Sequence, residues 1–136
     1  MPDIKQIRGI RNNNPLNLKR TSISWDGESK TNQDKTFETF TNPYYGIRAG
    51  AKLLLNYEKF HKINTVKDLI NRFAPPVENN TKSYIESVCK ALNLEENETF
   101  SIKENITPLV IAIIKHENGF NPYSSRLIKD GIELAL

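Results

Sequence analysis

Residues 106–124 read ITPLVIAIIKHENGFNPYS and predict a buried helix that ends in a single carboxylate. Thr107 suits the N-cap and Pro108 the first helical position, and residues 109–114 are all apolar. A helix that is apolar on every side is normally buried, so we expect this one in the middle of the domain. Gly119 suits the left-handed position that follows a helix end.

Glu117 is the carboxylate at the C-terminal end of this helix. The negative pole of the helix dipole favours the protonated form of an acid there, and partial burial would act in the same direction. Lys115 and His116 would act in the opposite direction if they turn toward it. An acid that stays protonated near neutral pH is what a general acid for glycoside cleavage needs. The alternative interpretation is a solvated glutamate at a helix end.

The remaining sequence predicts a mainly helical α+β fold, with residues 1–136 as a single domain. Residues 1–15 indicate an irregular arm, and β-prone stretches within residues 16–41 favour a small antiparallel sheet. From Pro43 onward the spacing of apolar residues is helical. It predicts four helices besides the central one, near residues 43–60, 65–73 and 80–93 and from Ser124 onward.

Composition and charge narrow the class of protein. With 38% hydrophobic and 26% charged residues, the chain is typical of globular rather than disordered proteins. A net charge of +3 suits an anionic polymer without selecting one. Since no helix carries a clustered basic face, we expect no nucleic-acid partner. Cys89 is the single cysteine, which excludes an internal disulfide framework.

The N-terminal sequence MPDIKQIRGI lacks the apolar segment of a secretory signal. We therefore expect synthesis in the cytoplasm without a signal peptide. No apolar run approaches the ~20 residues of a membrane span, so we expect none. A substrate in the cell wall would be reached after release by lysis, virion delivery or secretion.

A cluster of asparagines, residues 12–14 with Asn17 close behind, is the second unusual feature. Side-chain amides both donate and accept hydrogen bonds, which suits the N-acetyl and hydroxyl groups of amino sugars. The alternative is a loop in which these side chains satisfy their own backbone.

Residues 74–84, APPVENNTKSY, form a stiff approach to a helix start. Asn79, Asn80 or Thr81 suits the N-cap, and Tyr84 lies on the first turn. One interpretation is capping plus a packed aromatic residue. The other places the Tyr84 hydroxyl and Asn80 or Thr81 in a groove.

Trp25 could line a sugar site, although a lone tryptophan beside a small sheet is more often part of a core. His61 and His116 are not spaced as metal ligands with Cys89 or with a carboxylate cluster. We therefore expect neither a metal nor another cofactor.

Three segments together resemble enzymes that cleave peptidoglycan. IIKHENGFNPYS resembles the segment around the catalytic glutamate of lytic transglycosylases, with Asn118 where those enzymes have Ser. NNNPLNLKR, SWDG, FETF and YYGIRAGAKLLLNY resemble glucosaminidase-type wall hydrolases, and APPVENNTKSYI resembles the Tyr-bearing helix start over their cleft. Because the glutamate comes near the C-terminus, the resemblance implies a circularly permuted lysozyme-like domain. The whole chain is also similar to small phage and prophage proteins, whether virion-associated or of the lysis (endolysin) type.

This resemblance implies roles for individual residues. Glu117 would be the general acid and then the base, and Tyr84 would lie near the cleaved bond. The candidates for substrate binding are Asn14, Asn17, Trp25, Glu78, Asn80 and Thr81. No second carboxylate stands out among Asp26, Glu28, Glu38 and Glu78. A single acid fits transglycosylase chemistry, in which the N-acetyl group of the substrate stabilises the oxocarbenium-like state.

The sequence hypothesis is thus a monomeric enzyme that cleaves the β-1,4 bond between MurNAc and GlcNAc in peptidoglycan. A lytic transglycosylase is favoured over a hydrolase, because a hydrolase more often needs a second carboxylate. The alternative is a non-catalytic phage virion structural or cell-wall-binding protein with the same fold.

Overall fold

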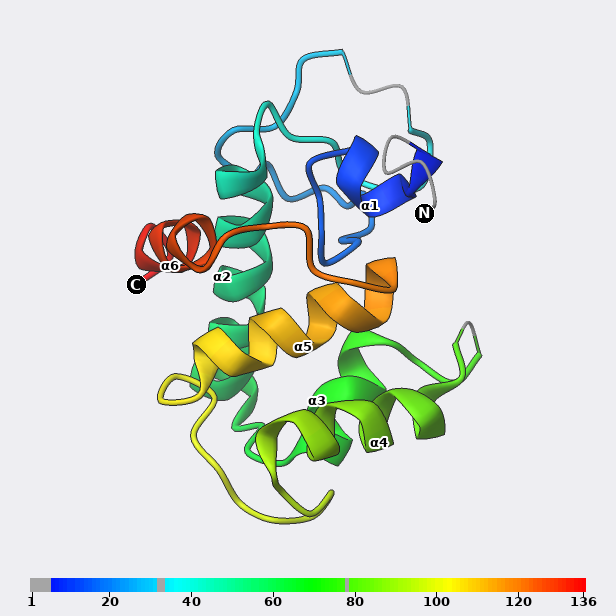
Figure 1. Ribbon diagram of the computed structural model, residues 1–136, viewed down its shortest axis with the longest axis vertical. Helices are drawn as coiled ribbons and strands as arrows, with labels where there is room; N and C mark the ends of the chain where they lie inside the picture. The colour runs from blue at the N-terminus through cyan, green and yellow to red at the C-terminus, as the bar shows by residue number, and fades with distance from the viewer. Residues whose placement is uncertain (1–5, 32–33, 78) are drawn as a thin grey trace.

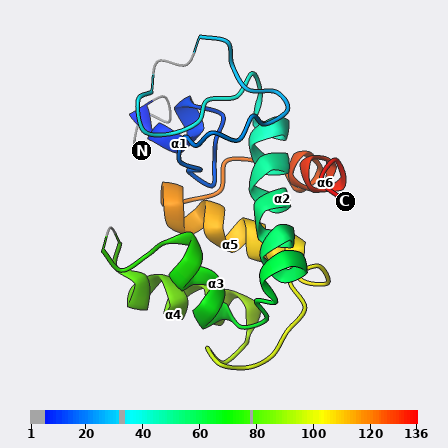
Figure 2. The same ribbon diagram turned by 180° about the vertical axis from the view of Figure 1, so that it is seen from behind.

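The computed structural model describes residues 6–31, 34–77 and 79–136. Within these ranges helix α5 crosses the middle of the molecule (Figures 1 and 2). Helix α1 and the loops that follow it lie on one side of α5, α3 and α4 lie on the other, and α6 packs against α2. The helices are α1 (Arg8–Arg11), α2 (Pro43–His61), α3 (Val66–Phe73), α4 (Thr81–Leu92), α5 (Ile106–Asn118) and α6 (Ser125–Glu133).

The central position predicted for the apolar helix is confirmed. Helix α5 contacts α1, α2, α4 and α6, and residues 109–114 are buried or half-buried. Gly119 follows it with a φ of 83°, the predicted left-handed conformation. The predicted Thr107 N-cap is wrong, because the helix begins at Ile106. Asn105 occupies the cap position and forms no side-chain cap bond there.

The four other predicted helices are confirmed, and each begins at a capping side chain. In every case the side chain accepts a hydrogen bond from the backbone N–H three residues further along. Such a bond satisfies one of the donors that a helix start leaves unpaired, so these starts are encoded locally. The capping residues are Asn42, Thr65, Asn80 and Ser124.

The predicted antiparallel sheet in residues 16–41 is wrong, and so is the α+β class. The described residues form helices, turns and loops without a sheet. Strand-like pairing among them is limited to two isolated antiparallel bridges, Lys19 with Phe37 and Glu28 with Phe40. A lysozyme-like domain with an N-terminal sheet is therefore not the fold observed.

Side chains supply many of the hydrogen bonds in this region, beside a few backbone bonds such as that from the Glu38 N–H to the Leu18 carbonyl. Asn14 is fully buried, and its Nδ2 donates to the carbonyls of Leu18 and Glu38 at 3.0 Å each. Its Oδ1 accepts the N–H of Leu18 at 3.0 Å. Asp34 Oδ1 accepts two further backbone N–H groups at 2.9 Å each. Since side chains occupy some of the backbone groups that a continuous ladder would pair, the backbone bonds stay isolated and no sheet forms.

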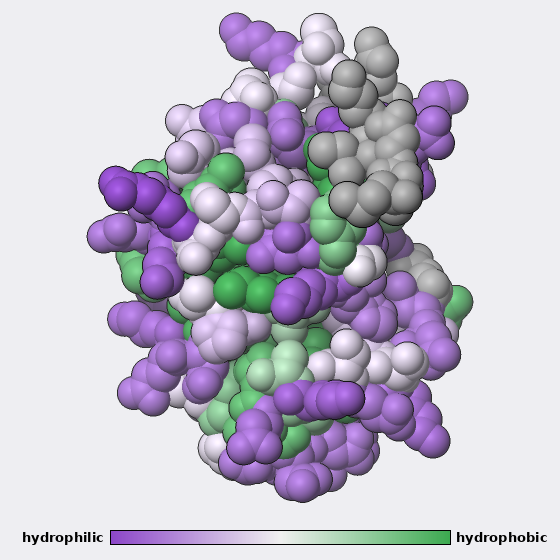
Figure 3. Space-filling view, in the orientation of Figure 1, coloured by the Kyte–Doolittle hydropathy of each residue, from purple (hydrophilic) through white to green (hydrophobic). Residues whose placement is uncertain are grey.

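Helix α1 lies in the segment predicted to be an irregular arm, of which residues 1–5 fall outside the described ranges. Four residues are too few to show a helical period, and the helix is held by packing against α5. Hydrophilic side chains cover most of the face drawn in Figure 3, with smaller hydrophobic patches near its middle. Across the described ranges, no helix combines the length and apolar character needed to span a membrane.

Candidate functional site

Three segments that are distant in the sequence meet at the carboxyl group of Glu117, near the C-terminal end of α5. Asn17 Nδ2 donates to Oε1 over 2.9 Å, and the Tyr84 hydroxyl donates to Oε2 over 2.8 Å. These donors lie 100 and 33 residues from Glu117 along the chain. Because each oxygen accepts one bond, the orientation of the half-buried carboxyl group is fixed.

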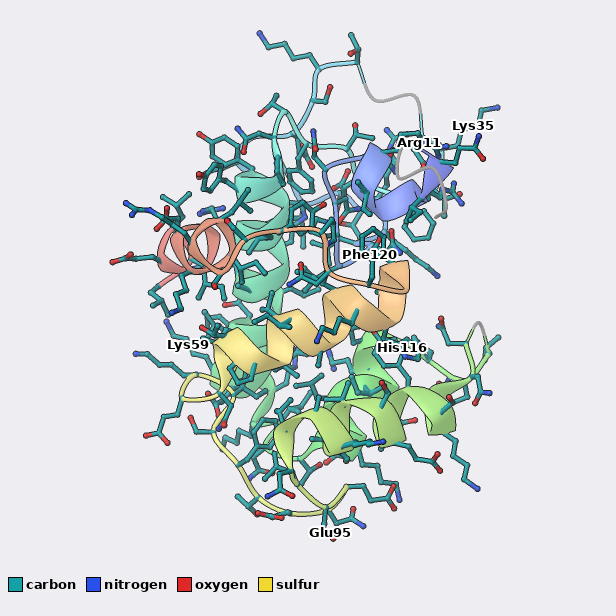
Figure 4. All side chains as sticks on the ribbon, in the orientation of Figure 1. Arg11, Lys35, Lys59, Glu95, His116 and Phe120 are labelled. Carbon is teal, nitrogen blue, oxygen red and sulfur yellow. The ribbon has the colours of Figure 1, made fainter. Side chains whose placement is uncertain are left out.

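Tyr84 is held as a neutral donor. Its side chain is 1% exposed, and burial raises the pKa of its hydroxyl well above the ordinary value of 10.0. The charge of Glu117 and the hydrogen bond to it act in the same direction. The His116 ring stacks on the Tyr84 ring at 3.7 Å between centroids, and Figure 4 places His116 where α5 approaches α4. The hydroxyl therefore keeps its proton and its direction.

Asn118 is a positioning residue that sequence reasoning did not identify. Its Nδ2 donates to the carbonyls of Pro15 at 2.8 Å and of Ile114 at 2.9 Å. The first bond ties the end of α5 to the loop that carries Asn17, which itself has a left-handed backbone with φ 52°. Its position directly after Glu117 was a signal in the sequence, because the segment differs there from the lytic transglycosylase motif that it resembles, which has Ser.

Gly9 allows the loop that carries Asn17, and Asn118 at the end of α5, to pack closely against α1. A Cβ added there would overlap Asn118 Oδ1 and lie 2.9 Å from Asn17 Oδ1 and 3.1 Å from the Asn14 carbonyl oxygen. Both of these Oδ1 atoms are buried without a hydrogen-bond partner in the structure. The absence of a side chain at residue 9 therefore decides where Asn17 sits, and Asn17 in turn holds Glu117.

A cleft of about 600 Å³ lies beside Glu117, a volume within the range of ligand-binding sites. Its lining comes from residues 8–37, from α2, and from residues 72–79. Among the described residues that line it, Glu117 carries the single carboxylate. The other lining residues are Arg8, Asn17, Leu18, Lys19, Thr21, Ile23, Trp25, Thr36, Phe37, Leu53, Tyr57, Arg72, Phe73, Ala74, Pro75 and Asn79.

The other predicted binding residues differ in their burial and in whether they line the cleft. Trp25 lines the cleft with Asn17. Asn14 is fully buried in the backbone contacts described above, and Thr81 is 6% exposed and donates to the Ala74 carbonyl at 2.6 Å. Asn80 is exposed and caps α4. Glu78 lies outside the described residues.

The other described carboxylates considered from the sequence lie outside the cleft lining. Asp26 pairs with Arg48 at 3.3 Å. Glu38 and Glu28 line a separate polar pocket of about 310 Å³. Burial, followed by the neighbouring Glu28, raises the pKa of Glu38 to about 7. In the described ranges no group of three or more His, Cys, Asp or Glu side chains could hold a metal ion.

Over 129 residues the chain is 40% identical to protein P5 of Pseudoalteromonas phage PM2, covering 93% of this chain and 80% of that protein. The chain belongs to the P5 family. Its membership confirms the prediction of a phage protein. A scan against protein-family models gave no match.

In this member of the P5 family, Glu117 presents an oriented carboxyl group beside the cleft. The carboxyl group is fixed by two donors, lies at a cleft and is flanked by an aromatic residue that cannot readily ionise. Trp25 and Phe37 add aromatic surface to the cleft, which suits the apolar faces of sugar rings.

Proposed function

We propose that this P5-family protein cleaves the β-1,4 bond between MurNAc and GlcNAc in peptidoglycan, with Glu117 as the acid and base. The observation that carries the proposal is the Glu117 carboxyl group, fixed by Asn17 and Tyr84 at the edge of a 600 Å³ cleft. The protein would act as a monomer, at the wall, after release, virion delivery or secretion.

The chemistry is that of a lytic transglycosylase. Glu117 donates its proton to the glycosidic oxygen as the bond from that oxygen to C1 of MurNAc breaks. The N-acetyl oxygen of this MurNAc stabilises C1. The Glu117 carboxylate then takes the proton of the 6-hydroxyl as that oxygen bonds to C1, which gives a 1,6-anhydro sugar and restores the acid. This route needs one carboxylate, in keeping with the single one among the described cleft residues.

Digestion of purified peptidoglycan, followed by mass spectrometry, tests the proposal. Wild-type protein should release anhydro-muropeptides, whereas Glu117→Gln, which keeps an acceptor for Tyr84, should release none. Glu133→Gln is the matched control, because Glu133 is an exposed glutamate near the end of another helix. New reducing ends in place of anhydro products would indicate a hydrolase. Equal product from wild type and Glu117→Gln would exclude catalysis by Glu117.

The second candidate is a non-catalytic virion structural or wall-binding protein. The match to protein P5 supports it better than it supports an enzyme, since the match shows a phage protein and carries no information on catalysis. This candidate predicts that the protein sediments with purified cell walls but releases no muropeptides, with or without Glu117→Gln.

A further inference from the structure

Three cationic side chains line the cleft beside Glu117. Arg8, Lys19 and Arg72 line it together with the one described carboxylate. Arg8 is neutralised by Asp34, whose carboxylate accepts two bonds from the guanidinium at 2.7 Å each. Within the described chain, Arg72 has no such partner: its contacts are with Tyr57 and His61, and it forms no ion pair with a carboxylate.

Tyr57 and His61 contact the exposed Arg72 guanidinium. The guanidinium carbon of Arg72 lies 5.3 Å from the centre of the Tyr57 ring. Tyr57 is 8% exposed and lines the same cleft. A guanidinium can only donate, so the 3.3 Å contact between Arg72 Nη2 and His61 Nε2 makes the imidazole nitrogen the acceptor. That contact uses one of five N–H groups and leaves others for a second acceptor.

A preorganised guanidinium with free N–H groups recognises a carboxylate through two parallel hydrogen bonds. Peptidoglycan presents carboxylates on its peptide stems and, where a stem is absent, on the lactyl group of MurNAc. Chitin has the same β-1,4 linkage and N-acetyl groups but is neutral. A glycan that binds in this cleft would therefore meet a cationic side chain, and only an acidic glycan can form an ion pair with it.

We propose that Arg72 binds a carboxylate of the MurNAc substituents and makes the cleft selective for peptidoglycan over neutral glycans. This inference rests on the proposed function only in that a glycan strand occupies the cleft. A purely structural arginine, packed on Tyr57, would instead affect all ligands to the same degree.

Binding measured by calorimetry separates these possibilities. The Glu117→Gln protein, used to prevent turnover, is titrated with three probes: a chito-oligosaccharide, a glycan fragment stripped to its lactyl carboxylates, and a peptide-bearing fragment. Adding Arg72→Gln should weaken binding of one or both acidic fragments about tenfold and leave the neutral probe unchanged. Arg126→Gln is the control, because Arg126 is 90% exposed on α6. Which acidic fragment responds identifies the carboxylate.

Two results would overturn the inference. One is that the Glu117→Gln protein binds the acidic fragments no more tightly than the neutral one. The other is that Arg72→Gln weakens all three probes equally. Failure of the wild-type protein to cleave peptidoglycan would overturn the proposed catalysis alone, because this measurement does not depend on turnover.

Discussion

Replacing Glu38 by glutamine should stabilise the protein at pH 8 and leave its stability at pH 5 nearly unchanged. Glu38 is 4% exposed, and its Oε2 is buried without a hydrogen-bond partner. Burial first, and the adjacent Glu28 next, raise the pKa of Glu38 from 4.5 to about 7. Above that pH the folded protein must keep two carboxylates close together, one of them buried.

The direction of the change in stability with pH follows from proton binding. Between pH 4.5 and about 7 the folded state keeps a proton on Glu38 that the unfolded chain has released. The free energy of unfolding therefore falls as the pH rises through this window. Each pKa unit is worth about 1.4 kcal/mol, so a rise from 4.5 to about 7 corresponds to a loss of at most about 3.5 kcal/mol. Arg20 and solvent in the pocket screen the charge, so we expect about 1–2 kcal/mol.

Urea unfolding at pH 5 and pH 8, followed by the fluorescence of Trp25, measures this effect. Glu38→Gln should exceed wild type by about 1–2 kcal/mol at pH 8 and by much less at pH 5. Glu28→Gln should show part of the same gain, because it removes the charged neighbour but not the burial of Glu38. Glu133→Gln, at an exposed site, should show none. A stability difference for Glu38→Gln that is the same at both pH values would refute the reasoning.

Two further substitutions test the support of the candidate site. Gly9→Ala should lower the free energy of unfolding by about 1–3 kcal/mol, because its Cβ displaces Asn17 and Asn118. It should also reduce muropeptide release below that of an equally destabilised core variant, and unchanged release would contradict the positioning role of Gly9. Tyr84→Phe should cost about 1–2 kcal/mol in urea unfolding and reduce release strongly, since Glu117 loses a donor. Equal release by Tyr84→Phe and wild type would show that the hydrogen bond from Tyr84 to Glu117 is not needed for cleavage.

Helices α2 to α6 were predictable because their signals are local. Residues such as Thr65 and Ser124 mark a helix start through a bond to a backbone group three residues away. The apolar run in α5 likewise predicted its central position without knowledge of its neighbours. The one cap predicted incorrectly, Thr107, lies in a helix whose start is set by packing and whose cap position forms no side-chain bond.

The sheet could not be predicted correctly, because the decisive bonds connect distant residues. Residues 36–40 have β propensity, but propensity does not say which groups their backbone will pair with. In the fold Asn14 and Asp34 supply some of those partners, and backbone groups more than 15 residues earlier, such as the Leu18 carbonyl, supply others. Glu117 was identified from its own helix, whereas Asn118 and Gly9 act through contacts with a loop that lies elsewhere in the chain.

Hydrogen bonds between distant residues also change the interpretation of the asparagine cluster. The side-chain amides of residues 12–14 all donate within the protein, to a carboxylate or to backbone carbonyls. Asn17 is the member of the cluster that reaches Glu117 and the cleft. In a region without a sheet, the first three amides fix the loop so that the fourth can orient the acid. Loss of activity on substituting residues 12–14 would therefore report the position of Asn17, and contact with a sugar is properly tested at residues that line the cleft, such as Trp25.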